Sequence, residues 1–160
     1  MKKLFEIWNK FLKEEKQRVV TFDFDDTLAL SHWGEEEDNW VHDGPQDKMI
    51  QEIKKFIEEP NTKVFIVTSR HQEHETRALK NPLQKSVKEF LDLHNINVDG
   101  VHFTDGKPKI ETLLKLNSLR HHDDDPEDIR DAKENNIEAI VSDPYGGYEK
   151  LRADMENETK

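Results

Sequence analysis

Three aspartates follow the most apolar segment of the chain. The segment VVTFDFDDTLAL (residues 19–30) begins as a buried strand and then presents Asp23, Asp25 and Asp26, with no Lys or Arg beside them. Carboxylates at such short spacing repel each other by energies on the order of kcal/mol. They stay ionised together only around a cation, and an all-oxygen ligand set without cysteine suits Mg²⁺. The segment therefore predicts a magnesium site.

Phosphoryl transfer is the chemistry that this pattern favours. A Mg²⁺ site flanked by Lys and Arg prefers a dianionic phosphoryl group, and a carboxylate can attack phosphorus to form an aspartyl phosphate. A second carboxylate two residues further along could protonate the leaving group and later activate water. Asp23 and Asp25 have this spacing. We therefore expect a metal-dependent phosphoryl-transfer site.

The surrounding sequence predicts strands that alternate with helices. Apolar strand patterns occupy residues 19–23, 63–68, 98–104 and 137–142, with a less apolar strand at 118–122. Helical patterns occupy residues 49–57, 83–91, 108–116 and 126–135. This alternation predicts an α/β domain of the three-layer, Rossmann-like kind, with a central, mainly parallel sheet and helices on both faces.

Two connecting segments are expected to have specific roles. Residues 31–45 are expected to form a polar loop that carries Trp33 and Trp40. Asn81 and Pro82 are expected to cap and begin the helix that follows the second strand.

The length of 160 residues fits one domain. We expect an amphipathic helix at 1–17, a catalytic core at 18–145 and a C-terminal helix or tail at 146–160. The first helix has an apolar stripe that we expect to pack on the sheet of its own chain, with a docking helix or a dimer contact as alternatives. The stripe consists of Leu4, Phe5, Trp8, Phe11 and Leu12.

The composition excludes several classes of protein. There is no cysteine, so disulfides and thiolate metal sites are excluded. The sequence shows neither an apolar run of membrane-spanning length nor the apolar core of a signal peptide, so we expect a cytoplasmic protein without a membrane partner. The net charge of −11 argues against an extended nucleic-acid-binding surface, because phosphate contacts require Lys and Arg.

Ligands of open α/β sheets bind outside the carboxyl ends of the strands. In this chain those ends carry two acidic clusters together with hydroxyl and basic side chains. The residues, in strand order, are Asp23, Asp25 and Asp26; Thr68, Ser69 and Arg70; Lys107 and Lys109; and Asp123, Asp124 and Asp125.

Four segments, in order, resemble the motifs of the haloacid dehalogenase superfamily of phosphatases. They are DFDDT (23–27), VFIVTSR (64–70), GKPKIETLLKL (106–116) and HHDDDPEDI (121–129). Each motif alone is weak, but the four together cover most of the chain, from about residue 19 to residue 141. The resemblance implies a Mg²⁺-dependent phosphatase that works through an aspartyl phosphate.

The resemblance also implies a role for each matching residue. Asp23 would be the nucleophile and a metal ligand, and Asp25 would be the general acid/base and would give its backbone carbonyl to the metal. Thr68 would hydrogen-bond the phosphoryl oxygens, and Lys109 would neutralise Asp23 and the phosphate. The metal site would be completed by Asp123 and Asp124.

Several positions leave alternatives open. Lys107 is a rival for the role of Lys109, and Asp124 with Asp125 is the alternative acidic pair. Asp26 stands where the motif often has glycine and could cap the following turn. Packing against neighbours is the favoured role of His121 and His122, with metal ligation as the alternative.

In the resembled superfamily, members with a large inserted cap enclose small substrates. The short segments between the motifs of this chain imply that it has no such cap and that its site is open to large substrates. Arg70 and the Gly-Pro of HDGPQDK resemble the phosphatase half of phage polynucleotide kinase–phosphatases, in which case Arg70 would clamp the phosphate bidentately. Trp33 and Trp40 could stack on a base or anchor the loop. The acidic run at residues 35–38 opposes the approach of a polyanion beyond its terminal nucleotide.

We therefore expect a phosphomonoester hydrolase whose lead substrate is a nucleic-acid 3′-phosphate end. A nucleotide or another small phosphomonoester, and a phosphoprotein, are the alternative substrates. The non-enzymatic alternative is a metal- or partner-binding module that retains the fold.

Overall fold

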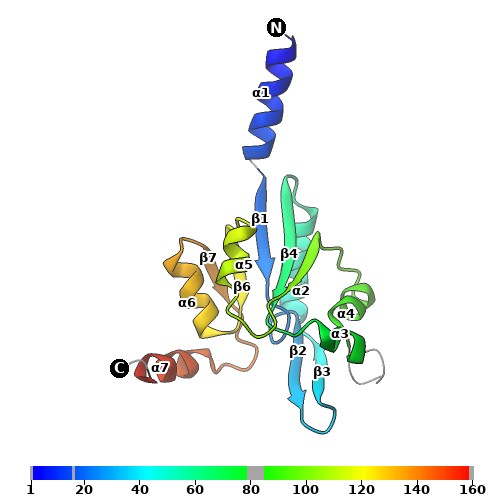
Figure 1. Cartoon of the computed structure of the whole chain (residues 1–160), viewed down its shortest axis with the longest axis vertical. Helices are drawn as coiled ribbons and strands as arrows, with labels where there is room; N and C mark the ends of the chain where they lie inside the picture. Colours follow the sequence, from blue (N-terminus) through cyan, green and yellow to red (C-terminus); the bar gives the residue numbers. More distant parts are fainter. Residues whose placement is uncertain (1, 16, 79–84, 159–160) are drawn as a thin grey trace.

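The computed structural model describes residues 2–15, 17–78 and 85–158, with the side chains of residues 10–15 and 77–78 left out (Figure 1). The central sheet has five strands in the order β5-β4-β1-β6-β7, and neighbouring strands are parallel. The strands are β1 (Arg18–Phe22), β4 (Thr62–Thr68), β5 (Gly100–Phe103), β6 (Arg120–Asp123) and β7 (Glu138–Val141). The α/β fold expected from the alternating pattern is therefore confirmed.

The strand order reverses direction between β1 and β6. From β1 the chain moves outward to β4 and β5, and then it crosses back to β6 and continues to β7. Such a reversal point is where open α/β sheets bind ligands, at the carboxyl ends of the strands. The ends of β1 and β6 are therefore the first place to look for a functional site.

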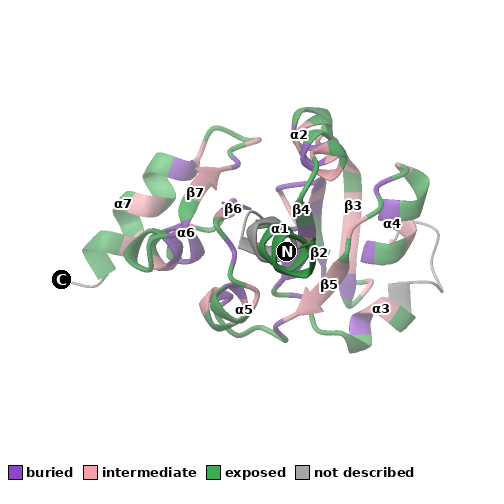
Figure 2. Cartoon of the chain, turned by 90° about the horizontal axis from the view of Figure 1, so that it is seen from above, coloured by how far each residue is buried: buried purple, intermediate pink, exposed green. Residues whose placement is uncertain are grey.

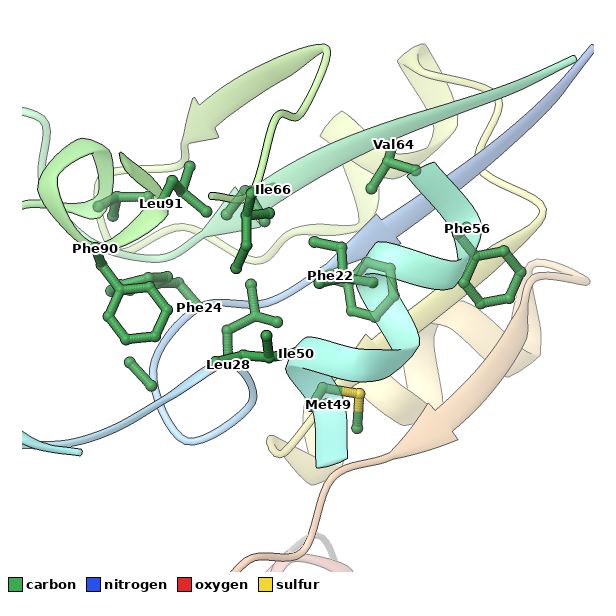
Figure 3. Packing of buried hydrophobic residues seen from close by; sticks show 14 of the residues in the cluster. Phe22, Phe24, Leu28, Met49, Ile50, Phe56, Val64, Ile66, Phe90 and Leu91 are labelled. Carbon is green, nitrogen blue, oxygen red and sulfur yellow. The ribbon is translucent and has the colours of Figure 1, made fainter. Parts of the chain in front are cut away.

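Helices cover both faces of the sheet, as Figure 2 shows for α2 and α5. On one face, α2 (Asp47–Glu58) and α4 (Val87–Leu93) pack on the alternate residues of β1 and β4 that point toward them (Figure 3). On the other face, α5 (Ile110–Lys115) and α6 (Pro126–Glu134) enclose a smaller cluster. The larger core includes Val20, Phe22, Val64, Ile66, Ile53 and Phe90, and the smaller includes Val67, Leu113, Ala132 and Ile137.

The strand β6 is buried although its sequence is polar. His121 and His122 are both fully buried. The ring of His122 stacks on Phe22 with 3.9 Å between the centroids, and its Nδ1 lies 3.2 Å from the carbonyl oxygen of Thr21. Burial lowers the pKa of His122 to about 3, so the ring is neutral and packs as an aromatic side chain.

The expectation of a loop at residues 31–45 is wrong. β2 (Ala29–Gly34) and β3 (Asn39–Pro45) form an antiparallel hairpin that projects beyond the carboxyl ends of the sheet strands (Figure 1). Trp33 pairs with Trp40 across the hairpin, with edge-to-face rings 5.8 Å apart. Such a cross-strand aromatic pair stabilises a hairpin. The strands were not predicted because their many polar residues interrupt the alternation of apolar and polar residues that is typical of a strand.

The remaining helices differ from expectation in detail. Between α3 (Glu73–Ala78) and α4 lie Asn81 and Pro82, which are outside the described residues. The N-cap of α4 is Ser86, whose hydroxyl accepts a hydrogen bond from the Glu89 backbone N–H. The C-terminal helix is α7 (Tyr148–Glu158), which lies beside α6 (Figures 1 and 2).

The helix α1 (Lys2–Glu15) extends away from the sheet (Figure 1). Leu4, Phe5 and Trp8 are 58–73% exposed, so the expected packing of this stripe on its own sheet is wrong. The physical reason is the direction of the chain, because α1 precedes the amino end of β1 and continues outward from it. The side chains of Phe11 and Leu12 lie outside the description.

No helix in the described part of the chain is both long and apolar enough to cross a membrane.

Candidate metal centre

Three carboxylates converge at the ends of β1 and β6. Asp23, Asp123 and Asp124 each offer an oxygen, and these oxygens lie within 4.8 Å of one another. The Asp23 backbone N–H donates to the carbonyl oxygen of His122 at 2.8 Å, which extends the pairing of the two strands to the site. Asp23 and Asp123 are buried, and Asp124 is half-buried. The cluster could hold a metal ion.

Lys109 is the cation of this cluster. Its Nζ lies 2.8 Å from Asp23 Oδ1, 2.7 Å from Asp123 Oδ2 and 3.5 Å from Asp128 Oδ2. Although burial disfavours the charge, these carboxylates raise the pKa of Lys109 well above its ordinary value. Lys107, the alternative lysine, is exposed. The structure therefore brings Lys109 to the site.

Asp123 is held from several sides. Its Oδ2 lies 2.7 Å from His121 Nε2, and its Oδ1 accepts a hydrogen bond from the Asp125 backbone N–H. The other ring nitrogen of His121 lies 2.8 Å from the hydroxyl of Thr21. Because both ring nitrogens of His121 are engaged, this histidine orients a carboxylate and does not face a metal.

The acidic run resolves into distinct roles. Asp124 belongs to the cluster, whereas the side chain of Asp125 caps α6 by accepting from the Glu127 backbone N–H at 2.8 Å. Of the two pairs considered from the sequence, the structure brings Asp123 and Asp124 together with Asp23.

The cluster has too little positive charge. Burial, with the nearby Asp123 carboxylate, raises the pKa of Asp23 well above its ordinary range, against the opposing effect of Lys109. Burial also raises the pKa of Asp124 to about 7. Asp123 behaves differently, since Lys109 and His121 overcome the effect of burial and hold its pKa below its ordinary value. One ammonium group thus serves four carboxylates, those of Asp23, Asp123, Asp124 and Asp128, and a divalent cation would offset much of the remaining negative charge.

The carboxylate of Asp25 points elsewhere. Arg70 grips it bidentately, with Nε 2.8 Å from Oδ2 and Nη2 2.7 Å from Oδ1. The side chain of Arg70 is only 1% exposed. The resemblance implied that Arg70 clamps the substrate phosphate, but in this structure its guanidinium binds Asp25.

Thr68 and Asp26 occupy neighbouring strand ends. Thr68 is buried at the end of β4, and its hydroxyl accepts a hydrogen bond from the Arg70 backbone N–H at 3.2 Å. Asp26 has a φ of 60°, a conformation that favours glycine. Its carboxylate accepts from the Ser31 backbone N–H and from the Tyr145 hydroxyl, both at 3.1 Å. Asp26 therefore stabilises the turn after β1.

The two tryptophans of the hairpin have different surroundings. Trp40 is half-buried, with its ring 5.5 Å from the guanidinium carbon of Arg70. Trp33 is 41% exposed and lies close to the turn formed by the acidic run at residues 35–38. Trp40 thus anchors the hairpin, whereas Trp33 is partly exposed, with its ring 5.5 Å from that of His74.

Sequence reasoning missed the contacts that hold the site residues. His121 and Thr21 orient Asp123, and the Thr27 hydroxyl donates to Asp23 Oδ2 at 3.1 Å. The threonine of the DFDDT motif could have pointed to Thr27. No local pattern points to the contact of Thr21 with His121, because only the pairing of β1 with β6 brings these two residues together.

Comparison of the sequence with family models and with curated proteins finds no match. A function for this chain therefore has to be inferred from its own residues: the four motifs and the geometry and electrostatics of this site.

Proposed function

We propose that the protein is a Mg²⁺-dependent phosphomonoester hydrolase that forms an aspartyl phosphate on Asp23. The observation that carries this proposal is the buried Lys109 ammonium between Asp23 and Asp123, beside Asp124, at the reversal point of a parallel sheet. The four motifs that resemble the haloacid dehalogenase superfamily support the same reaction.

The donor set fits magnesium. Asp23, Asp123 and Asp124 offer carboxylate oxygens, and the backbone carbonyl of Asp25 is a further candidate ligand. When bound, the ion would offset the charge of the carboxylates and of the phosphoryl oxygens.

The residues of the chain would share the reaction as follows. An oxygen of Asp23 attacks phosphorus, the bond from phosphorus to the leaving oxygen breaks, and protonated Asp25 gives that oxygen its proton. Asp25, now a carboxylate, takes a proton from water as the water oxygen bonds to phosphorus and the bond to Asp23 breaks. Lys109 and Thr68 would stabilise the phosphoryl charge throughout.

A nucleic-acid 3′-phosphate end is the lead substrate. Between β1 and β4 the described residues form a hairpin and one helix rather than a large cap, which suits a bulky substrate. The exposed ring of Trp33 could stack on a terminal base. The acidic turn at residues 35–38 favours the second candidate, a nucleotide or other small phosphomonoester, because it would repel a longer polyanion.

The test is phosphate release in Mg²⁺ and in EDTA across a panel of substrates. The panel holds a 3′-phosphorylated oligonucleotide, its 5′-phosphorylated twin, mononucleotides, a phosphopeptide and an aryl phosphate. Preference for the 3′-phosphorylated oligonucleotide supports the lead substrate, and preference for mononucleotides supports the second. Asp23→Asn, prepared in the same way, controls for contaminating phosphatases. If the wild type releases no phosphate from any substrate, the proposed enzymatic function is wrong and a metal- or partner-binding module is favoured.

A further inference from the structure

Most N–H donors of the Arg70 guanidinium are engaged within the protein. Nε donates to Asp25, Nη2 donates to Asp25 and lies 3.1 Å from His42 Nε2, and Nη1 donates to the Lys85 carbonyl oxygen at 3.1 Å. An arginine has five N–H donors. Four of them are accounted for by these contacts, and Nη1 also lies 4.0 Å from a carboxylate oxygen of Glu75.

Aromatic rings hold the guanidinium in place. Its central carbon lies 4.7 Å from the ring centroid of Phe24 and 5.5 Å from that of Trp40. Both contacts are at cation–π distance. Phe24 lies between Asp23 and Asp25 in sequence, so the residue that separates the two acids also supports the arginine.

We propose that Arg70 is a positioning residue that fixes the carboxylate of Asp25, and that it does not bind the substrate phosphate. This inference rests on the proposed function, in which Asp25 is the general acid/base. A phosphate that took Arg70 would leave the carboxylate of Asp25, 11% exposed, without its cation in a largely buried position. The bidentate pair instead holds the planar carboxylate in one orientation.

The pairing suits Asp25 for the second half of the reaction. The attacking water, unlike the leaving oxygen, is not held by a covalent bond to phosphorus, so its activation depends more on a fixed orientation of the Asp25 carboxylate. In that step the water oxygen bonds to phosphorus, the bond to Asp23 breaks, and the proton goes to Asp25. Loss of Arg70 should therefore slow hydrolysis of the phosphoenzyme more than its formation.

The first experiment separates the two roles by kinetics. We expect Arg70→Gln to lower kcat on an aryl phosphate with Mg²⁺ at least tenfold, with phosphoenzyme accumulation and no rise in KM. Arg70→Lys keeps the charge but cannot bind a carboxylate bidentately, so its kcat should be lowered nearly as much. Arg130→Gln, at an exposed position on α6, is the matched control. A rise in KM with kcat unchanged would overturn the proposal.

The second experiment measures phosphate binding without turnover. It uses an Asp25→Asn background, because there the removal of Arg70 does not leave a charged carboxylate at position 25 without its partner. Calorimetry with inorganic phosphate and Mg²⁺ compares the Asp25→Asn variant with the Arg70→Gln, Asp25→Asn double variant. We expect the two dissociation constants to agree within threefold. A tenfold weaker affinity of the double variant would make Arg70 a phosphate ligand and overturn the proposal.

The third experiment does not depend on any activity. Urea unfolding midpoints of Arg70→Gln, Asp25→Asn and the double variant test the pair directly. The double variant leaves no buried charge without its partner, so it should fold even if a single variant does not. We expect the double variant to lose clearly less stability than the sum of the single losses. An additive result overturns the pairing. If the wild type hydrolyses nothing while this coupling is present, the proposed function fails and the Arg70–Asp25 pair stands.

Discussion

Lys109 Nζ lies 2.8 Å from Asp23 Oδ1, although 86 residues separate the two in sequence. Asp23 follows the central strand β1, and Lys109 immediately precedes α5, on the connection from β5 to β6. The contact therefore exists only when the sheet and its second layer of helices are assembled. A site built this way ties the electrostatics of the carboxylate cluster to the stability of the fold.

Replacement of Lys109 should be severely destabilising. Lys109→Met keeps the length of the side chain but leaves Asp23, Asp123 and Asp128 without their shared cation. Loss of one partner of a buried ion pair costs roughly 3–5 kcal/mol. Urea unfolding in EDTA measures this loss, with the exposed Lys107→Met as its control. Equal midpoints for the two variants would show that the Lys109 contacts contribute nothing to stability.

Asp23→Asn should separate activity from stability. Turnover should fall by at least about 10³, because an amide cannot act as the nucleophile. Burial and Asp123 disfavour the charge of Asp23, so the neutral variant should be as stable in EDTA as the wild type, or more so. Phosphate release and urea unfolding are measured on the same preparations. Activity near that of the wild type would exclude the aspartyl-phosphate mechanism.

Mg²⁺ should stabilise the folded protein. An ion at about 100 times its dissociation constant adds roughly 2.7 kcal/mol, which corresponds to a rise in Tm of roughly 5–10 °C. Asp124→Asn should abolish most of this rise. Asp125→Asn should keep it, because asparagine retains the helix cap and Asp125 lies outside the cluster. Loss of the rise in Asp125→Asn as well as in Asp124→Asn would assign the metal to the alternative pair, Asp124 with Asp125.

The strands and helices of the core could be predicted because their hydrophobic patterns are local. Asp23, Lys109 and the acidic pair could be placed near one another because parallel strands bring their carboxyl ends to one edge. The sequence favours Lys109 over Lys107 but does not decide between them, since both precede the same helix and only packing determines which is buried.

Other features depend on tertiary contacts that leave no local signal. Arg70 meets Asp25 across 45 residues, and nothing in the neighbouring sequence distinguishes an arginine that binds a carboxylate from one that binds a phosphate. The hairpin was missed because polar residues such as Ser31 and Asn39 are buried in it. The stripe of α1 specifies a helix but does not specify what covers it.

The protonation state of His42 provides a prediction about pH. Arg70 donates to His42 Nε2 at 3.1 Å, and a guanidinium cannot accept, so the ring must be neutral with its proton on Nδ1. Burial and the charge of Arg70, opposed by Asp25 and by the Lys85 backbone, lower the pKa of His42 to about 4. In the unfolded chain the pKa is about 6.5. The neutral His42 ring therefore makes its full contribution to the stability of the folded protein above about pH 6.5, and this contribution is lost as the pH falls toward about 4.

His42→Gln is the matched variant for this prediction, because its amide oxygen can accept from Arg70 and does not titrate. Between pH 7.5 and pH 4, the stability of the wild type relative to His42→Gln should fall by no more than about 3 kcal/mol. Urea unfolding at each pH measures this difference, in which the effects of other titrating groups cancel. The imidazole resonances of His42, assigned by their absence from the variant, should remain those of the neutral ring down to about pH 5. A midpoint near pH 6.5 would show that Arg70 does not donate to His42 in solution.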